Sequence, residues 1–317
     1  MKRKQIIHII EWVVALAACG YLVWRLATYD DYVSLFAELR EMDIAQWGAL
    51  VASVLLMPVN MTIEAWRWRT LMNEGESRVE SQEVMGWGEA HRQVYYSKLA
   101  GLITPWRLGE YPARGLLMQE DSLSQEIEQV SSKALWTKVL TMGAVGSATM
   151  TIAIVIGGLI GLAMAGSPVN LGDNYISILL GVLVGAVLLI AAGWKIRTVL
   201  LSSYSSPSAH RRLTVGMICK NILQSIVRLL CWCIQLGLLL YALAALTEIT
   251  GLTAIYYLLV TITPNVPIAE IGVRGAWAIA VFGTPQAAIA AVVLWVINTL
   301  LPCVGWLFLR KKTIKFA

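Results

Sequence analysis

Charged residues are scarce in this sequence. Asp, Glu, Lys and Arg together make up 14% of the 317 residues, whereas a soluble domain typically has about 25%. Hydrophobic residues make up 57%, and the mean hydropathy is +0.66. A soluble chain of this length needs more polar surface, so the composition excludes an ordinary soluble protein and predicts an integral membrane protein.

Histidine and paired cysteines are also lacking. There are three histidines and five cysteines, and the cysteines all lie in apolar segments without metal-ligand spacing. No phosphate-binding loop or nucleotide motif is present, and no serine or cysteine has a plausible base beside it. We therefore expect no metal, no cofactor, no nucleic-acid partner and no catalytic residue, although a membrane transferase with a few charged loops stays open.

Long apolar runs predict an all-α, polytopic membrane protein that forms a single transmembrane domain over residues 1–317. A spanning helix needs roughly 20 apolar residues. The first run follows a basic start and resembles a signal peptide, but it is long enough to be a retained spanning helix. The third run is long, so we expect it to be tilted or broken at Gly157–Gly158. The six expected spans are residues 5–27, 44–66, 134–165, 175–194, 215–246 and 285–309.

Two segments interrupt this pattern with proline, glycine, arginine and glutamate. They are Thr104–Gly115 and Thr263–Gly275, within the broken stretches 94–118 and 252–283. Proline removes a backbone donor, and irregular backbone at membrane depth is tolerated only when protein covers it or it lines a wet cavity. We predict two re-entrant hairpins; a pair of short spans in each place is the alternative.

The distribution of basic residues predicts the orientation. Fifteen Lys and Arg lie at the start, after the second and fourth spans and at the end, whereas the intervening loops carry Arg40. The positive-inside rule then places both termini in the cytoplasm. The alternation also predicts an inverted-topology repeat of halves 1–166 and 167–317, with the hairpin tips meeting near the midplane, where such proteins bind substrate.

Ionisable residues at membrane depth cost about 2.5–3.5 kcal/mol each on insertion scales, so each needs a reason. In each hairpin a glutamate precedes an arginine by four residues, so the two would share a helix face. Further polar residues lie inside the second and fifth spans. The candidate binding residues are Arg107, Glu110, Arg114, Glu270, Arg274, Arg228, Asn60 and Glu64.

Two interpretations of these residues stay open. They could pair and hold the hairpins to their neighbours, or they could bind an anion. Arginines outnumber glutamates in the hairpins and the fifth span, and the arginine fork binds phosphate bidentately, so a phosphate site is favoured. Glu110 and Glu270 would then orient the arginines or take protons. The basic cluster Arg67, Arg69, Arg211 and Arg212 we interpret as a topological and lipid-surface signal.

These residues carry a family resemblance. Pro105, Arg107, Gly109, Glu110 and Arg114 resemble the hallmark of the lysylphosphatidylglycerol synthase transmembrane-region family, also called flippase-like domain proteins. The segment Pro267–Arg274 is similar to that family's second motif, and Asn60 and Arg67-Trp68 are similar to its earlier positions. The second motif departs from the family, because Gly275 follows Arg274 where the family often has glutamate.

The resemblance implies a lipid flippase-like transporter of a bacterial inner membrane, without the soluble synthase domain of some members. Its partners would be lipids with anionic head groups, and Arg107, Arg114, Arg228 and Arg274 would hold the phosphate. A membrane enzyme or accessory subunit acting on a lipid-linked sugar or aminoacyl lipid is the alternative. A scaffold that only binds lipid is a third possibility.

Overall fold

The computed structural model describes residues 40–73, 85–104, 107, 109–124, 132–164, 215–245, 251–263 and 270–309, together with Gly20 and Trp24. These residues are helical almost throughout and include no strand, which confirms the all-α prediction. The helices are α3 (Ile44–Asn73), α4 (Trp87–Ile103), α5 (Glu110–Ser124), α6 (Ser132–Met164), α8 (Val215–Ala242), α9 (Leu252–Ile262), α10 (Glu270–Phe282), α11 (Pro285–Trp295), the π-helix η5 (Val296–Leu300) and α12 (Leu301–Leu309).

Four helical segments of the described chain are long and apolar enough to cross a membrane. They lie in α3, α6, α8 and the continuous run from α11 through η5 into α12. They match four of the six expected spans and indicate a membrane protein. The other two expected spans, 5–27 and 175–194, lie outside the described residues apart from Gly20 and Trp24.

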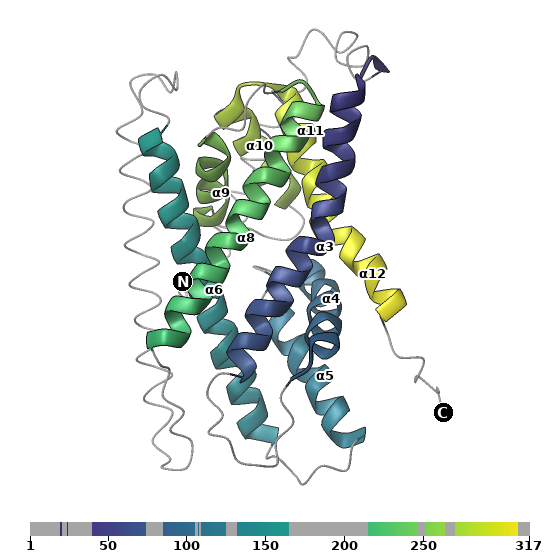
Figure 1. Ribbon diagram of the computed structural model, residues 1–317, viewed down its shortest axis with the longest axis vertical. Helices are drawn as coiled ribbons and strands as arrows, with labels where there is room; N and C mark the ends of the chain where they lie inside the picture. The colour runs from purple at the N-terminus through teal and green to yellow at the C-terminus, as the bar shows by residue number, and fades with distance from the viewer. Residues whose placement is uncertain are drawn as a thin grey trace.

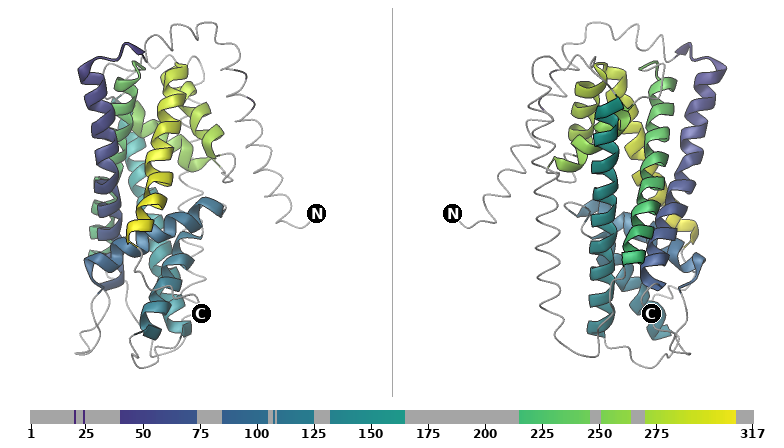
Figure 2. Two further views of the ribbon diagram at one scale, coloured as in Figure 1. Left: turned by 90° about the vertical axis from the view of Figure 1, so that its right-hand side faces the viewer. Right: turned by 60° about the vertical axis from the view of Figure 1, so that its left-hand side comes forward.

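The long helices run up or down the long axis of the molecule (Figure 1). α3 and the α11–α12 run descend, whereas α6 and α8 ascend. The two broken stretches are helix pairs at opposite ends: α4 and α5 lie in the lower half, and α9 and α10 in the upper half (Figures 1 and 2). Each pair therefore starts and finishes toward one end of the molecule, as a hairpin does.

Both hairpins turn at a threonine that precedes a proline. Thr104 (φ −109°, ψ 138°) ends α4 and Thr263 (φ −78°, ψ 125°) ends α9, each in an extended conformation. A following proline disfavours the helical region for the residue before it, so the sequence stops both helices at these points. The Thr104 hydroxyl accepts a hydrogen bond from the Gly109 amide at 2.9 Å, and the Trp277 indole donates to the Thr263 hydroxyl at 2.8 Å. Each threonine thus ties the two arms of its own hairpin together.

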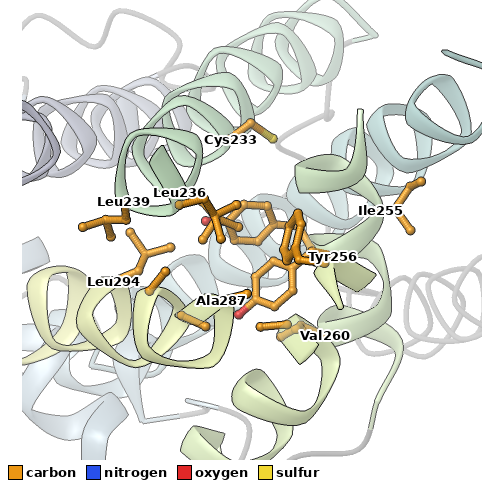
Figure 3. Close-up of a cluster of buried hydrophobic side chains, with 14 of the residues drawn as sticks. Cys233, Leu236, Leu239, Ile255, Tyr256, Val260, Ala287 and Leu294 are labelled. Carbon is orange, nitrogen blue, oxygen red and sulfur yellow. The ribbon is translucent and has the colours of Figure 1, made fainter. Parts of the chain in front are cut away.

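Two hydrophobic clusters pack the described helices. The upper cluster joins α8, α9, α10 and α11, with Leu236, Tyr256 and Ala287 among its fully buried members (Figure 3). The lower cluster joins α3, α4 and α6 around Trp68 and Val139. Between them on the buried face of α8 lie the polar residues Asn221, Gln224, Ser225 and Arg228, so a polar layer separates the two clusters.

Glycines allow α6 to approach its neighbours closely. We expected this helix to be tilted or broken at Gly157 and Gly158; α6 continues unbroken through both, which excludes the break. A Cβ at Gly157 would lie 2.5 Å from Leu229, and one at Gly158 would lie 2.5 Å from Leu258. One turn on, a Cβ at Gly161 would lie 2.5 Å from the Gly251 carbonyl oxygen. Small residues at such positions let helix backbones pack tightly in membrane proteins.

We expect Gly161→Ala to lower the thermal unfolding midpoint by about 3–8 °C in detergent, because the new methyl group meets rigid backbone and overpacking costs about 1–3 kcal/mol. Gly48→Ala is the matched control, since Gly48 is also helical and nothing lies within 4 Å of a Cβ there. Equal midpoints for the two variants would contradict the close α6 contact.

Candidate functional site

A polar stripe follows the buried face of α3. Ser53, Asn60, Glu64, Arg67 and Thr70 are all buried, and their spacings of seven, four and three place them on one side of the helix. α3 packs most extensively against α8, whose polar residues complete the interface. Because buried polar groups need partners, the stripe has to be matched by donors and acceptors from other helices.

Glu64 is the centre of this interface. One of its carboxylate oxygens lies 2.8 Å from Arg114 Nη2, and the other lies 2.8 Å from Arg67 Nη1 and also pairs with Arg228 Nη1. The three arginines come from α5, α3 and α8, and their side chains are at most 8% exposed. One carboxylate thus joins three helices and neutralises part of their charge.

Aromatic rings and further acceptors fix two of these arginines. The Arg114 guanidinium lies 4.8 Å from the ring centre of Trp68, and its Nε donates to Ser97 at 3.2 Å. The Arg228 guanidinium lies 4.7 Å from the Trp232 ring, and its Nε donates to Asn60 at 3.1 Å. Such cation–π contacts strengthen when they are desolvated, so both side chains are held in one position.

The first helix pair, α4 and α5, which we call hairpin one, adds a buried ion pair; α9 and α10 form hairpin two. Lys98 Nζ of α4 lies 3.0 and 2.9 Å from the two carboxylate oxygens of Glu110, the first residue of α5. The arms approach closely here because Gly101 faces Glu110: a Cβ at Gly101 would lie 2.7 Å from Glu110 Cγ. Arg114 lies 3.7 Å from the same carboxylate, so the expected Glu110–Arg114 contact exists but is the longer one. Arg114 has its close partner in Glu64.

Hairpin two repeats the arrangement and is joined to hairpin one. Glu270 is the first residue of α10. Its Oε1 accepts from Arg274 Nε at 3.0 Å and lies 2.8 Å from Arg274 Nη2, so the two side chains share a helix face as the four-residue spacing predicts. The same oxygen lies 2.9 Å from Arg107 Nη2, which comes from the turn of hairpin one. The Arg107–Glu270 ion pair therefore connects the two hairpins.

The π-helix η5 contributes two consecutive residues to the site. Asn298 accepts from Asn60 at 3.0 Å and donates to Gln235 at 2.7 Å, whereas the next residue, Thr299, accepts from Arg107 at 3.0 Å. π segments inside α-helices occur frequently at functional sites. Here the segment presents neighbouring side chains both to the α3–α8 interface and to the turn of hairpin one.

Arg107 has an unusual backbone. Its φ angle is +54°, in the left-handed region that costs an L-residue other than glycine roughly 1–2 kcal/mol. Its side chain is 31% exposed, in contrast to the arginines around Glu64. Its Nη1 lies 3.9 Å from Glu110 Oε1, which is too long for a hydrogen bond. Among the cations of this network, Arg107 is thus the most exposed, and its left-handed backbone conformation costs free energy.

The network carries a surplus of positive charge. Within the described residues it joins six basic side chains to three glutamates, so three cations have no matching anion when all groups are ionised. The basic residues are Arg67, Lys98, Arg107, Arg114, Arg228 and Arg274, and the acidic ones are Glu64, Glu110 and Glu270. A low-dielectric interior with this surplus attracts anions. No group of three or more His, Cys, Asp or Glu side chains suited to a metal ion occurs in the described part of the chain.

All eight residues predicted from the sequence belong to this one network of contacts. Asn60 reaches Glu64 through Arg228, and Glu64 reaches Glu270 through Arg114, Glu110 and Arg107. The interpretation of Arg67 as a lipid-surface residue was wrong. α3 continues past the expected end at Trp66, so Arg67 falls one turn after Glu64 on the buried face. Arg69 likewise contacts protein, donating to the Met85 carbonyl at 3.0 Å.

Three members of the network were missed from the sequence. Lys98 lies twelve residues before its partner Glu110, and the two meet because the turn folds α5 back on α4. Asn298 and Thr299 lie in an expected ordinary span, and their joint role depends on the π segment. A lysine inside an otherwise apolar stretch was the one available signal, since such a residue needs a partner.

No protein-family model matches this chain, and no curated protein matches it either.

We expect Glu64→Gln to destabilise the protein strongly, because it leaves three buried arginines around a neutral amide. Breaking a buried ion pair from one side costs about 3–5 kcal/mol, or roughly 10 °C in the unfolding midpoint. Glu89→Gln is the control: Glu89 accepts from the neutral amide of Gln93 at 3.0 Å, and its loss of charge should matter little. A Glu64→Gln midpoint equal to that of Glu89→Gln would contradict the central role of Glu64.

Proposed function

We propose that this protein is a flippase-like transporter that binds a membrane lipid through its anionic, phosphate-containing head group and moves it between leaflets. The observation that carries the proposal is the buried network with three surplus cations, which extends from Glu64 to the place where hairpins from opposite ends of the molecule meet. A surplus of positive charge in the interior of a membrane protein is costly unless a negatively charged ligand binds there.

The chemistry of the basic residues supports phosphate as the recognised group. Five of the six cations are arginines, whose planar fork matches the oxygens of a phosphate and which stay charged when buried. A lipid would present this group at the hairpins while its chains stay in the bilayer. The resemblance of the two hairpin segments to the flippase-like domain family supports the same proposal.

The two hairpins act as gates in this proposal, and the halves 1–166 and 167–317 form an inverted repeat. The similar design of the hairpins supports it: each second helix begins with a glutamate followed four residues later by arginine, as Glu110–Arg114 and Glu270–Arg274. The hairpins lie at opposite ends of the molecule (Figure 1). Re-entrant entry into the bilayer, six spans in total and alternating access complete the proposal.

The proposed location is the bacterial inner membrane, with both termini in the cytoplasm. Asp43 and Gly88 are exposed residues near opposite ends of α3, since the start of α4 contacts the end of α3 through Asn73 and Met85. In a variant without native cysteines, Asp43→Cys should react with a membrane-impermeant maleimide in spheroplasts. Gly88→Cys should react only after lysis. The reverse pattern would invert the orientation, and labelling of both sites before lysis would contradict a spanning α3.

We expect wild-type protein in proteoliposomes to exchange a labelled phosphatidylglycerol between leaflets, and Arg107→Ala to slow this exchange at least about tenfold. The loss follows from removing a charge-assisted hydrogen bond to the phosphate, worth about 1.5–3 kcal/mol. The rate would be measured by dithionite quenching of the label in the outer leaflet.

The control is Arg40→Ala, which removes an exposed arginine outside the network and should exchange lipid at the wild-type rate. Exchange that is equally fast in the Arg107→Ala and Arg40→Ala variants would remove the network from the pathway. Absence of exchange by folded wild type, together with chemical turnover of a lipid substrate in detergent, would favour a membrane enzyme instead.

A further inference from the structure

The arginines of the network differ in how firmly the protein already holds them. Arg114 and Arg228 each pair with Glu64, donate to a second side chain and lie against an aromatic ring. A head group could recruit them only by breaking several contacts at once. These two residues are therefore suited to holding the helices together rather than to changing partner during transport.

Arg107 is held in a way that permits exchange. Its side chain donates from Nη2, to Glu270 at 2.9 Å and to Thr299 at 3.0 Å, whereas Nη1 lies 3.9 Å from Glu110 Oε1. Its side chain is the most exposed of the network, and its backbone is in the left-handed region. Few contacts, accessibility and local strain together describe a side chain that can leave its partner.

Glu270 does not depend on Arg107 for charge compensation. Arg274, four residues on in the same helix, donates to Glu270 from Nε, and its Nη2 lies 2.8 Å from the same oxygen. If Arg107 departs, Glu270 remains paired within α10. The contact between the hairpins can thus open without leaving a buried carboxylate unpaired. An unpaired buried carboxylate would make opening very costly.

We propose that Glu270 occupies, on Arg107, the place that the phosphate of the lipid takes during transport, so that head-group binding breaks the ion pair between the two hairpins. This inference rests on the proposed function and adds to it a ligand residue, a competing carboxylate and a link between binding and opening. Thr299 shares the closed position, because it accepts from the same nitrogen as Glu270 does.

The geometry couples ligand affinity to the closed contact. When Arg107 is engaged by Glu270 and Thr299, it is not available to phosphate, and the apparent affinity falls with the fraction of molecules in that state. Weakening the closed contact should therefore strengthen phosphate binding. A site in which Glu270 and Thr299 merely positioned Arg107 for its ligand would respond in the opposite direction.

The experiment measures binding of dodecyl phosphate to the full-length protein in dodecyl maltoside micelles, followed by isothermal titration calorimetry. We expect Glu270→Gln and Thr299→Val to bind about fivefold or more tightly than wild type, at the lower end of typical coupling between states. Thr299→Ser keeps the acceptor oxygen and should bind as wild type does. Arg107→Ala should lose at least about tenfold in affinity.

Unchanged or weaker binding by either folded variant overturns the inference. If Glu270→Gln fails to fold, Thr299→Val decides alone, because it preserves every charge. Wild type could move lipid between leaflets while Arg107→Ala binds dodecyl phosphate with unchanged affinity. That result would leave the proposed function standing and contradict the change of partner at Arg107. Neither binding nor leaflet exchange by folded wild type would end both. Inorganic phosphate that binds as tightly as dodecyl phosphate would identify a free anion, rather than a lipid, as the source of the phosphate.

Discussion

The arrangement of the described helices depends on one buried carboxylate that holds three arginines. Guanidinium groups stay ionised in an apolar interior, so they have to be paired or expelled. Glu64 pairs with arginines from α3, α5 and α8 and so positions hairpin one against the central helix pair. The other two carboxylates, Glu110 and Glu270, lie in the hairpins, where one cation, Arg107, is 31% exposed.

The two ends of this network therefore differ in how firmly their side chains are held, and the proposed function uses the less firmly held end. Around Glu64 the side chains are buried, multiply bonded and held by aromatic rings. At the turn of hairpin one, Arg107 has few bonds and a backbone conformation that costs energy. Strain of this kind persists only where the surrounding structure enforces it, and it concentrates at sites that bind or switch. Under the proposed function, the surplus of positive charge that is costly to bury is also what attracts the anionic head group.

The parts of the structure that could be predicted were those encoded locally. Threonine before proline ends both α4 and α9, and four of the apolar runs correspond to the helical segments that are long and apolar enough to cross a membrane. The eight candidate residues also belong to one network, because charged side chains in apolar segments are costly unless they pair with one another. Lys98 and Thr299 were not predicted. Lys98 meets Glu110 because α5 folds back on α4, and Thr299 meets Arg107 in a π-helical segment; neither feature has a local sequence signal. Arg67 was misjudged because Trp66-Arg67-Trp68-Arg69 has the composition of a membrane-interface anchor, although only its helical phase decides burial.

The two separate hydrophobic clusters have a mechanical consequence. α9 and α10 pack into the upper cluster and α4 into the lower one, while α3 and α8 run past both. Apolar packing resists deformation, whereas hydrogen-bonded polar side chains can exchange partners at little volume change. The helices α3, α6 and α8 cross the polar layer without a break, and the contacts of Arg114 and Arg228 there resist sliding of one cluster past the other. Under the proposed function, relative movement of the two ends would therefore be confined to the hairpins, at the Arg107–Glu270 ion pair.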